Sequence, residues 1–234
     1  MSKIEDVKAL TFDLFGTVLD LAGSLTPFIQ RFLREHDSSL DPAQIWKQLR
    51  ARQRVEQYQD TLLMMGHSGY LATARRAFLY VLRLNKVSFT SEEIERFMEG
   101  WKELEPFEDA VEGLEQLKGR YRLVVLSNGD EWFLQYLVKN RVRFDFDEVI
   151  SAQTVGAFKP HPAVYRACVR ILGREPHELM MVSSNSFDVM GARACGFRAA
   201  WVERYGLPYE ETLYQPDLVV KDFRELATAL IHAR

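Results

Sequence analysis

The chain has 234 residues, of which 47% are hydrophobic and 27% charged, and its formal net charge is −3. These values are typical of a globular protein with a sizeable core, and the charge gives no reason to expect a nucleic acid or an anionic membrane as partner. No apolar run approaches the length of a membrane span. The acidic amino terminus is unlike a signal peptide, and Cys168 and Cys195 lie in helical patterns. We therefore expect a cytoplasmic protein with reduced thiols.

Apolar runs and helical patterns alternate through the second half of the chain, and one further apolar run lies near its start. The runs predict strands at 7–12, 121–126, 148–151, 179–182, 199–202 and 218–220. Helical patterns at 107–118, 130–139, 162–172 and 187–195 separate most of these strands. Alternation of this kind predicts an α/β fold with a parallel sheet, in which the carboxyl ends of the strands share one edge.

The stretch 21–101 interrupts this alternation. It reads as four helices, at 25–36, 42–59, 71–86 and 91–100, with helix starts at Asp41-Pro42 and at Thr90 to Glu93. We predict a catalytic core of residues 1–20 and 102–234, with 21–101 as an inserted helical cap over the end of the first strand. A separate helical interaction domain is the alternative.

The first predicted strand ends at Asp13, which precedes a glycine turn. A carboxylate at the carboxyl end of a central strand faces the crevice in which α/β sheets bind ligands, so Asp13 can act as a nucleophile. Phe15, two residues on, can neither donate nor accept a proton. The leaving group must therefore depart without protonation from that position.

Three further polar clusters lie where strands end. Ser127-Asn128 precedes a helix and suits an anion, although a capping turn would have the same composition. Lys159 lies in a glycine- and proline-bounded segment that would fix its ammonium, although an isolated lysine is usually solvated. Asp188 ends the run from Ser183, and is either a general base or a first-turn acid.

Together these clusters resemble the four motifs of the haloacid dehalogenase superfamily, which implies a Rossmann-like core. The motifs are matched, in chain order, by Asp13 to Thr17, Ser127-Asn128, Lys159-Pro160 and Ser183 to Asp188. Phosphatases of this superfamily carry a second aspartate where Phe15 stands, and a metal-binding carboxylate where Ser184 stands. Both departures favour carbon–halogen cleavage, because halide leaves as a stable anion and needs no acid. The phosphatase remains an alternative.

The fourth motif, together with Tyr165, more closely resembles that of the L-2-haloacid dehalogenases. In the predicted cap, Arg52 matches that family's active-site arginine. Arg50 and Arg54 flank Arg52 on the same helix, and the sequence leaves open which arginine lines the site. Phe15 and Phe187 replace the tyrosine and tryptophan of many members, which affects the shape of the pocket.

The resemblance implies hydrolysis of short (S)-2-haloalkanoic acids to (R)-2-hydroxy acids and halide, through an ester on Asp13. In this scheme Asp188 activates water, Lys159 balances the two carboxylates, and Ser127 with backbone amides binds the substrate carboxylate. Arg52, Asn128 and Phe187 surround the halide. The implied catalytic residues are Asp13, Lys159, Asp188, Ser183, Asn185 and Thr17, and the implied substrate-binding residues are Leu14, Phe15, Arg52, Ser127, Asn128, Tyr165 and Phe187.

The resemblance further implies that the enzyme needs no metal or cofactor and forms a homodimer. Its partner is a small 2-haloalkanoate rather than a nucleic acid or a membrane. Two other functions stay open, namely a related hydrolase that opens a small ring bearing a carboxylate, and a catalytically silent binding protein.

Overall fold

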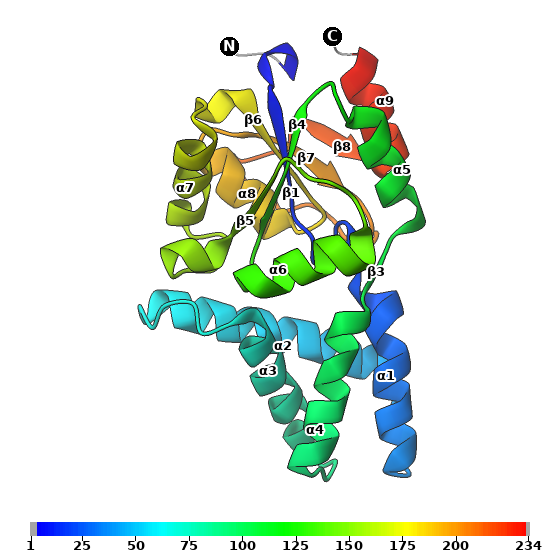
Figure 1. Ribbon diagram of the computed structural model, residues 1–234. Helices are drawn as coiled ribbons and strands as arrows, with labels where there is room; N and C mark the ends of the chain where they lie inside the picture. The colour runs from blue at the N-terminus through cyan, green and yellow to red at the C-terminus, as the bar shows by residue number, and fades with distance from the viewer. Residues whose placement is uncertain (1–3, 233–234) are drawn as a thin grey trace.

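A six-stranded parallel sheet forms the centre of the computed structural model, which describes residues 4–232 (Figure 1). The strand order is β5-β4-β1-β6-β7-β8, and every neighbouring pair is parallel. The strands are β1 (Ala9–Phe12), β4 (Arg122–Ser127), β5 (Glu148–Ser151), β6 (Leu179–Ser183), β7 (Arg198–Val202) and β8 (Leu218–Val220). The predicted α/β fold is confirmed, and β1 lies inside the sheet, so its carboxyl end opens onto the central crevice.

Helices cover both faces of this sheet. One group is α5 (Glu108–Leu117), α6 (Glu131–Leu137) and α9 (Phe223–His232), and the other is α7 (Pro162–Leu172) and α8 (Ser186–Ala194). Leu10 and Phe12 of β1 join the core on the first face, whereas Ala9 joins the core on the second. This alternation follows from the period of two along a strand.

The four predicted helices between the first two sheet strands are present, and we call them the helical insert. They are α1 (Leu21–Glu35), α2 (Pro42–Leu62), α3 (Tyr70–Leu84) and α4 (Ser91–Met98). The chain enters and leaves the insert through a two-stranded antiparallel sheet of β2 (Leu19–Asp20) and β3 (Glu105–Pro106). In Figure 1 the insert lies below the carboxyl ends of the parallel strands, with α2 running across directly beneath them.

Capping residues set the ends of the insert helices. Asp41 caps α2 ahead of Pro42, and Thr90 and Glu93 form a capping box at α4, as the sequence predicts. Helix α1 begins four residues before the predicted start, because the Asp20 side chain accepts a hydrogen bond from the Gly23 amide.

Short helical turns complete the described chain. Four 3₁₀ turns occur at Ile4–Asp6, Glu99–Glu103, Ala152–Val155 and Pro176–Glu178, and a π-helical turn at Val138–Val142 follows α6. Cys168 and Cys195 are both free thiols, as predicted. Within residues 4–232, no helix combines the length and the apolar character needed to cross a membrane.

Candidate active site

The four sequence clusters meet at the carboxyl edge of the sheet. Asp13 directly follows β1, Ser127 ends β4 and Ser183 ends β6, while Lys159 lies on the segment between β5 and α7. Asp188 lies in the first turn of α8. The parallel topology therefore brings together side chains that are up to 175 positions apart in the chain, the separation between residues 13 and 188.

Asp13 is held by donors on both carboxylate oxygens and is only 5% exposed. Ser127 Oγ donates to Oδ1 over 2.9 Å, and Lys159 Nζ lies 3.7 Å from the same oxygen. Asn185 Nδ2 donates to Oδ2 over 2.9 Å, and Thr17 Oγ1 donates to it over 3.2 Å. These contacts fix the orientation of the carboxylate.

Asp188 forms a buried pair with Lys159. The Lys159 ammonium donates to Oδ2 over 2.7 Å, and the Tyr165 hydroxyl donates to Oδ1 over 2.8 Å. Burial raises the pKa of Asp188, and the charge of Asp13 raises it too, although Lys159 acts in the opposite direction. Burial also raises the pKa of Tyr165 well above its ordinary value, so this hydroxyl is a stable donor to Asp188.

Other predicted site residues hold this arrangement in place through hydrogen bonds to backbone amides. Ser183 Oγ accepts the Asn185 amide over 3.1 Å, and Asn128 Oδ1 accepts the Lys159 amide over 2.7 Å. Leu14 reaches the site only through its backbone amide, which lies 3.4 Å from Ser127 Oγ, because its side chain is fully buried in the core.

Helix α2 closes the site from the insert side. Arg54 Nη2 donates to Asn185 Oδ1 over 2.9 Å, and its guanidinium lies 5.2 Å from the centre of the Phe187 ring. Arg54 Nε is buried without a hydrogen-bond partner among the described residues. The cavity between this wall and Asp13 has a volume of about 20 Å³, which is room for about one water molecule.

Arg52, the arginine that the sequence resemblance assigns to the halide site, lies outside this cavity. Its guanidinium binds the Glu56 carboxylate and lies 4.1 Å from the centre of the Tyr80 ring on α3. Residues two apart on a helix point in nearly opposite directions, whereas residues four apart share a face. Arg50 and Arg54 therefore face Asp13 together, and Arg52 faces α3. The expected position of Arg52 beside Asp13 is therefore not observed, and Arg50 and Arg54 line the cavity in its place.

Three other residues on this wall are not predicted from the sequence. Gln57 Oε1 accepts from Asn128 Nδ2 at 3.5 Å, and Tyr70 stacks on Phe15 with ring centres 3.8 Å apart. Burial raises the pKa of Tyr70 to about 12. His67 Nε2 lies 2.8 Å from the Asn128 carbonyl oxygen, and burial lowers the pKa of this imidazole. Only the spacing of Gln57 from Arg50 and Arg54 on one helical face could have indicated any of them.

The donor set at this edge does not fit a metal-dependent phosphatase. The Ser184 hydroxyl stands where such an enzyme has a carboxylate, and Phe15 replaces its second aspartate. Among residues 4–232, no three histidine, cysteine, aspartate or glutamate side chains gather in a way that could hold a metal ion. Magnesium prefers carboxylate and water oxygens, so the ligands present here are a poor match for it.

Comparison with known proteins identifies consistent relatives. A family model described as haloacid dehalogenase-like hydrolase matches residues 7–196. Haloacetate dehalogenase H-2 of Moraxella sp. (strain B) is 29% identical over 94% of this chain and 95% of its own. The (S)-2-haloacid dehalogenase of Xanthobacter autotrophicus is 33% identical over 85% of this chain and 76% of its own. A solved L-2-haloacid dehalogenase from that organism, with chloropropionic acid covalently bound, has a TM-score of 0.82 and 27% identity, covering 96% of this chain and 98% of that one.

Proposed function

Because this chain belongs to the haloacid dehalogenase-like hydrolases, we propose that it hydrolyses (S)-2-haloalkanoic acids to (R)-2-hydroxy acids and halide. One observation carries the proposal. Both carboxylate oxygens of Asp13 accept hydrogen bonds, and across the pocket lies the Arg54 guanidinium, whose Nε has no hydrogen-bond partner among the described residues. The names of the relatives support the same chemistry. Phe15, beside the nucleophile, suits a leaving group that takes no proton.

The first step is displacement at carbon. A carboxylate oxygen of Asp13 attacks C2 of the substrate from the side opposite the halogen, so a carbon–oxygen bond forms as the carbon–halogen bond breaks. The halide leaves with the bonding electron pair and C2 is inverted. In this approach the halide departs toward α2, where the Arg54 guanidinium offers positive potential and Phe187 lines the pocket.

The second step is hydrolysis of the ester on Asp13. Asp188 removes a proton from water, and the hydroxide attacks the side-chain carbonyl carbon of Asp13. The carbon–oxygen bond between that carbonyl and the substrate breaks, and the departing 2-hydroxy acid takes the proton back. Lys159, 2.7 Å from Asp188 and 3.7 Å from Asp13, balances the charge of both carboxylates during the cycle. Ser127 and the amides after Asp13 are the proposed site of the substrate carboxylate.

A halide-release assay tests the proposal directly. The enzyme is incubated with each enantiomer of 2-chloropropionate, with and without a chelator, and with a phosphomonoester panel plus magnesium. We expect chloride release from the (S) enantiomer, insensitivity to the chelator and no phosphate release. Single turnover in ¹⁸O-water adds a mechanistic check, because the product hydroxyl should carry unlabelled oxygen from Asp13. Phosphate release without chloride release would refute the proposal.

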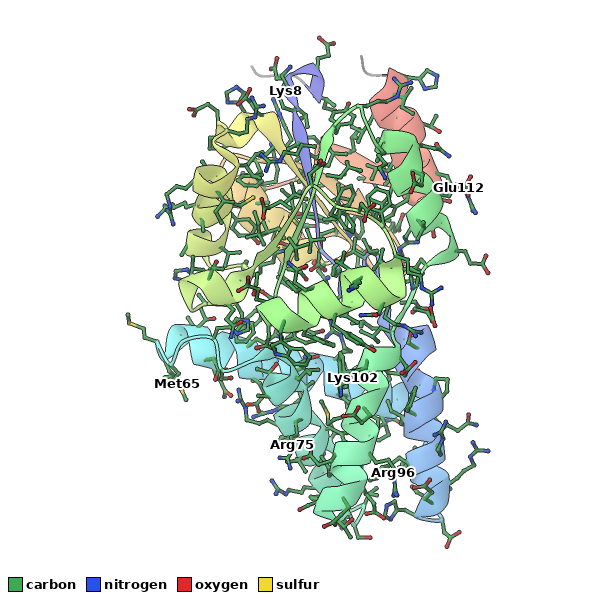
Figure 2. The ribbon with its side chains drawn as sticks, in the orientation of Figure 1. Lys8, Met65, Arg75, Arg96, Lys102 and Glu112 are labelled. Carbon is green, nitrogen blue, oxygen red and sulfur yellow. The ribbon has the colours of Figure 1, made fainter. Side chains whose placement is uncertain are left out.

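We also propose the homodimer that the resemblance implies. Support comes from four consecutive exposed apolar side chains where α2 ends, which are Leu62, Leu63, Met64 and Met65. Met65 projects away from the molecule at the tip of this segment (Figure 2). Contiguous exposed apolar groups mark interaction sites in many proteins. Light scattering of the wild type and of Met64→Glu measures the mass; a monomeric wild type would refute this part.

A further inference from the structure

A second, much larger cavity adjoins the pocket at Asp13. It has a volume of about 520 Å³ and lies between α1, α2 and the segment after β7. Its lining combines the cationic Lys47, Arg50 and Arg54 with the apolar side chains of Leu21, Ala22, Ala43, Trp46, Ala51 and Leu207. This volume falls in the range of cavities that bind small organic molecules, and an apolar wall with few polar groups is typical of them.

The large cavity borders the catalytic pocket and shares wall residues with it. Arg50, Arg54 and Asn185 line both spaces, and Asn185 donates directly to Asp13. Gly16, three residues after the nucleophile, also lines the large cavity. Its φ of +87° favours glycine, and a Cβ there would lie 2.8 Å from the Tyr205 hydroxyl. The turn that carries Asp13 thus borders the cavity directly.

The geometry of displacement leaves one substituent of C2 for this cavity. The halogen must point away from Asp13, toward Arg54, and the substrate carboxylate is bound by Ser127 and the backbone amides after Asp13. The remaining carbon substituent of C2 points to the side of the line that joins Asp13 and the halogen. The pocket beside Asp13 has a volume of only about 20 Å³. Beyond Asn185, however, lies the large cavity, whose volume is about 26 times that of the pocket, which is the ratio of 520 to 20.

We propose that this cavity binds the apolar C2 substituent of the substrate, so that the enzyme favours 2-halo acids with alkyl chains of several carbons over two- and three-carbon acids. The inference rests on the proposed function and names its substrate class. Each methylene moved from water into the cavity contributes up to about fourfold to kcat/KM. A cavity that served only as an entrance would give no such dependence on chain length.

The test is a chain-length series of 2-bromo acids, from propionate through butyrate and hexanoate to octanoate, with bromide release as the readout. We expect kcat/KM to rise at least tenfold from propionate to hexanoate. Unbrominated octanoate should inhibit bromide release competitively, and more strongly than unbrominated propionate does. A flat or falling series overturns the inference while leaving the proposed function intact, whereas bromide release from none of the acids refutes both.

Two neighbouring positions on the first turn of α2 give a matched pair of variants. Ala43 and Gln44 are both exposed, but only Ala43 lines the cavity. Ala43→Phe should lower kcat/KM for 2-bromooctanoate at least tenfold and leave 2-bromopropionate within twofold. Gln44→Phe should change neither value. Equal effects of Ala43→Phe on short and long acids would overturn the assignment of the cavity to the C2 chain.

Discussion

Two methionine variants distinguish the two candidate arginines. The structure places Arg54 beside Asp13, whereas the sequence resemblance suggests Arg52. Methionine keeps an unbranched side chain and removes the charge. Among the described residues, Arg54 donates one side-chain hydrogen bond, to Asn185, and its buried Nε has no hydrogen-bond partner, so a departing halide would meet an available donor. Arg52 already shares Glu56 and the Tyr80 ring. The Arg52 guanidinium therefore interacts at the contact between α2 and α3.

The expected losses of kcat in the two variants differ by more than an order of magnitude. Loss of one donor that stabilises developing charge in a closed site costs about 10²- to 10³-fold in kcat, or about 2.7–4 kcal/mol. We expect Arg54→Met to fall in this range. Arg52 belongs to an ion pair four residues apart on a helix, with its own side chain 26% exposed, and such pairs contribute about 0.3–0.5 kcal/mol to stability. Arg52→Met should therefore keep kcat within threefold of the wild type.

Initial rates of halide release over a range of (S)-2-chloropropionate concentrations give kcat and KM for both variants. Thermal unfolding checks that each variant is folded, and Arg54→Lys tests whether a charge without the planar donor restores part of the rate. If Arg52→Met lost activity a hundredfold while Arg54→Met retained it, the halide site would lie on the opposite face of α2. The proposed geometry would then be refuted.

Four further predictions address the base, a buried ion pair and a buried histidine. Asp188→Asn should release about one halide per enzyme and then stop, with the ester detectable by mass spectrometry; continued turnover would contradict its role as base. Since the pKa of Asp188 is raised and the base must be deprotonated, kcat should decline on acidification at a higher pH than for an ordinary carboxylate, and an acid limb at or below about pH 3.9 would count against it. Arg204→Met removes a bidentate pair with Asp109 at 2.8 and 2.9 Å and should lower the free energy of unfolding by about 3–5 kcal/mol in urea titrations; a loss under 1 kcal/mol would contradict this. Burial lowers the pKa of His67, so the wild type should lose more stability than His67→Phe as pH falls below about 6.5, and parallel pH profiles of unfolding would exclude this cause.

The sequence predicts the core of the fold well because strands and helices there have strong periodic patterns. All six strands of the parallel sheet occur close to the predicted positions. The two-residue strands at Leu19–Asp20 and Glu105–Pro106 are too short to have a pattern and were not predicted. Nor does a 3.6-residue pattern indicate the π-helical turn at Val138–Val142, which interrupts the predicted helix at 130–139.

The same reasoning explains which site residues the sequence finds. Asp13, Ser127 and Ser183 follow or end parallel strands, so topology alone places them at one edge, whatever the rotamer of each side chain. The stack of Phe15 on Tyr70 and the contact of His67 with Asn128 join the insert to the core. Their geometry depends on how the insert sits over the sheet, which no local pattern encodes.

The choice among the arginines of α2 depends on the rotation of one helix about its axis. Rotation is normally read from an apolar stripe, but α2 buries polar side chains, namely Gln53, Glu56, Gln57 and Asp60, beside Ile45 and Leu49. Its two faces therefore look alike in the sequence. Partners settle the rotation: Glu56 lies one turn after Arg52 and takes its guanidinium toward α3. Both arginines lie near an aromatic ring, but Arg52 is paired with a carboxylate, whereas Arg54 donates to the neutral Asn185 and its buried Nε has no hydrogen-bond partner among the described residues.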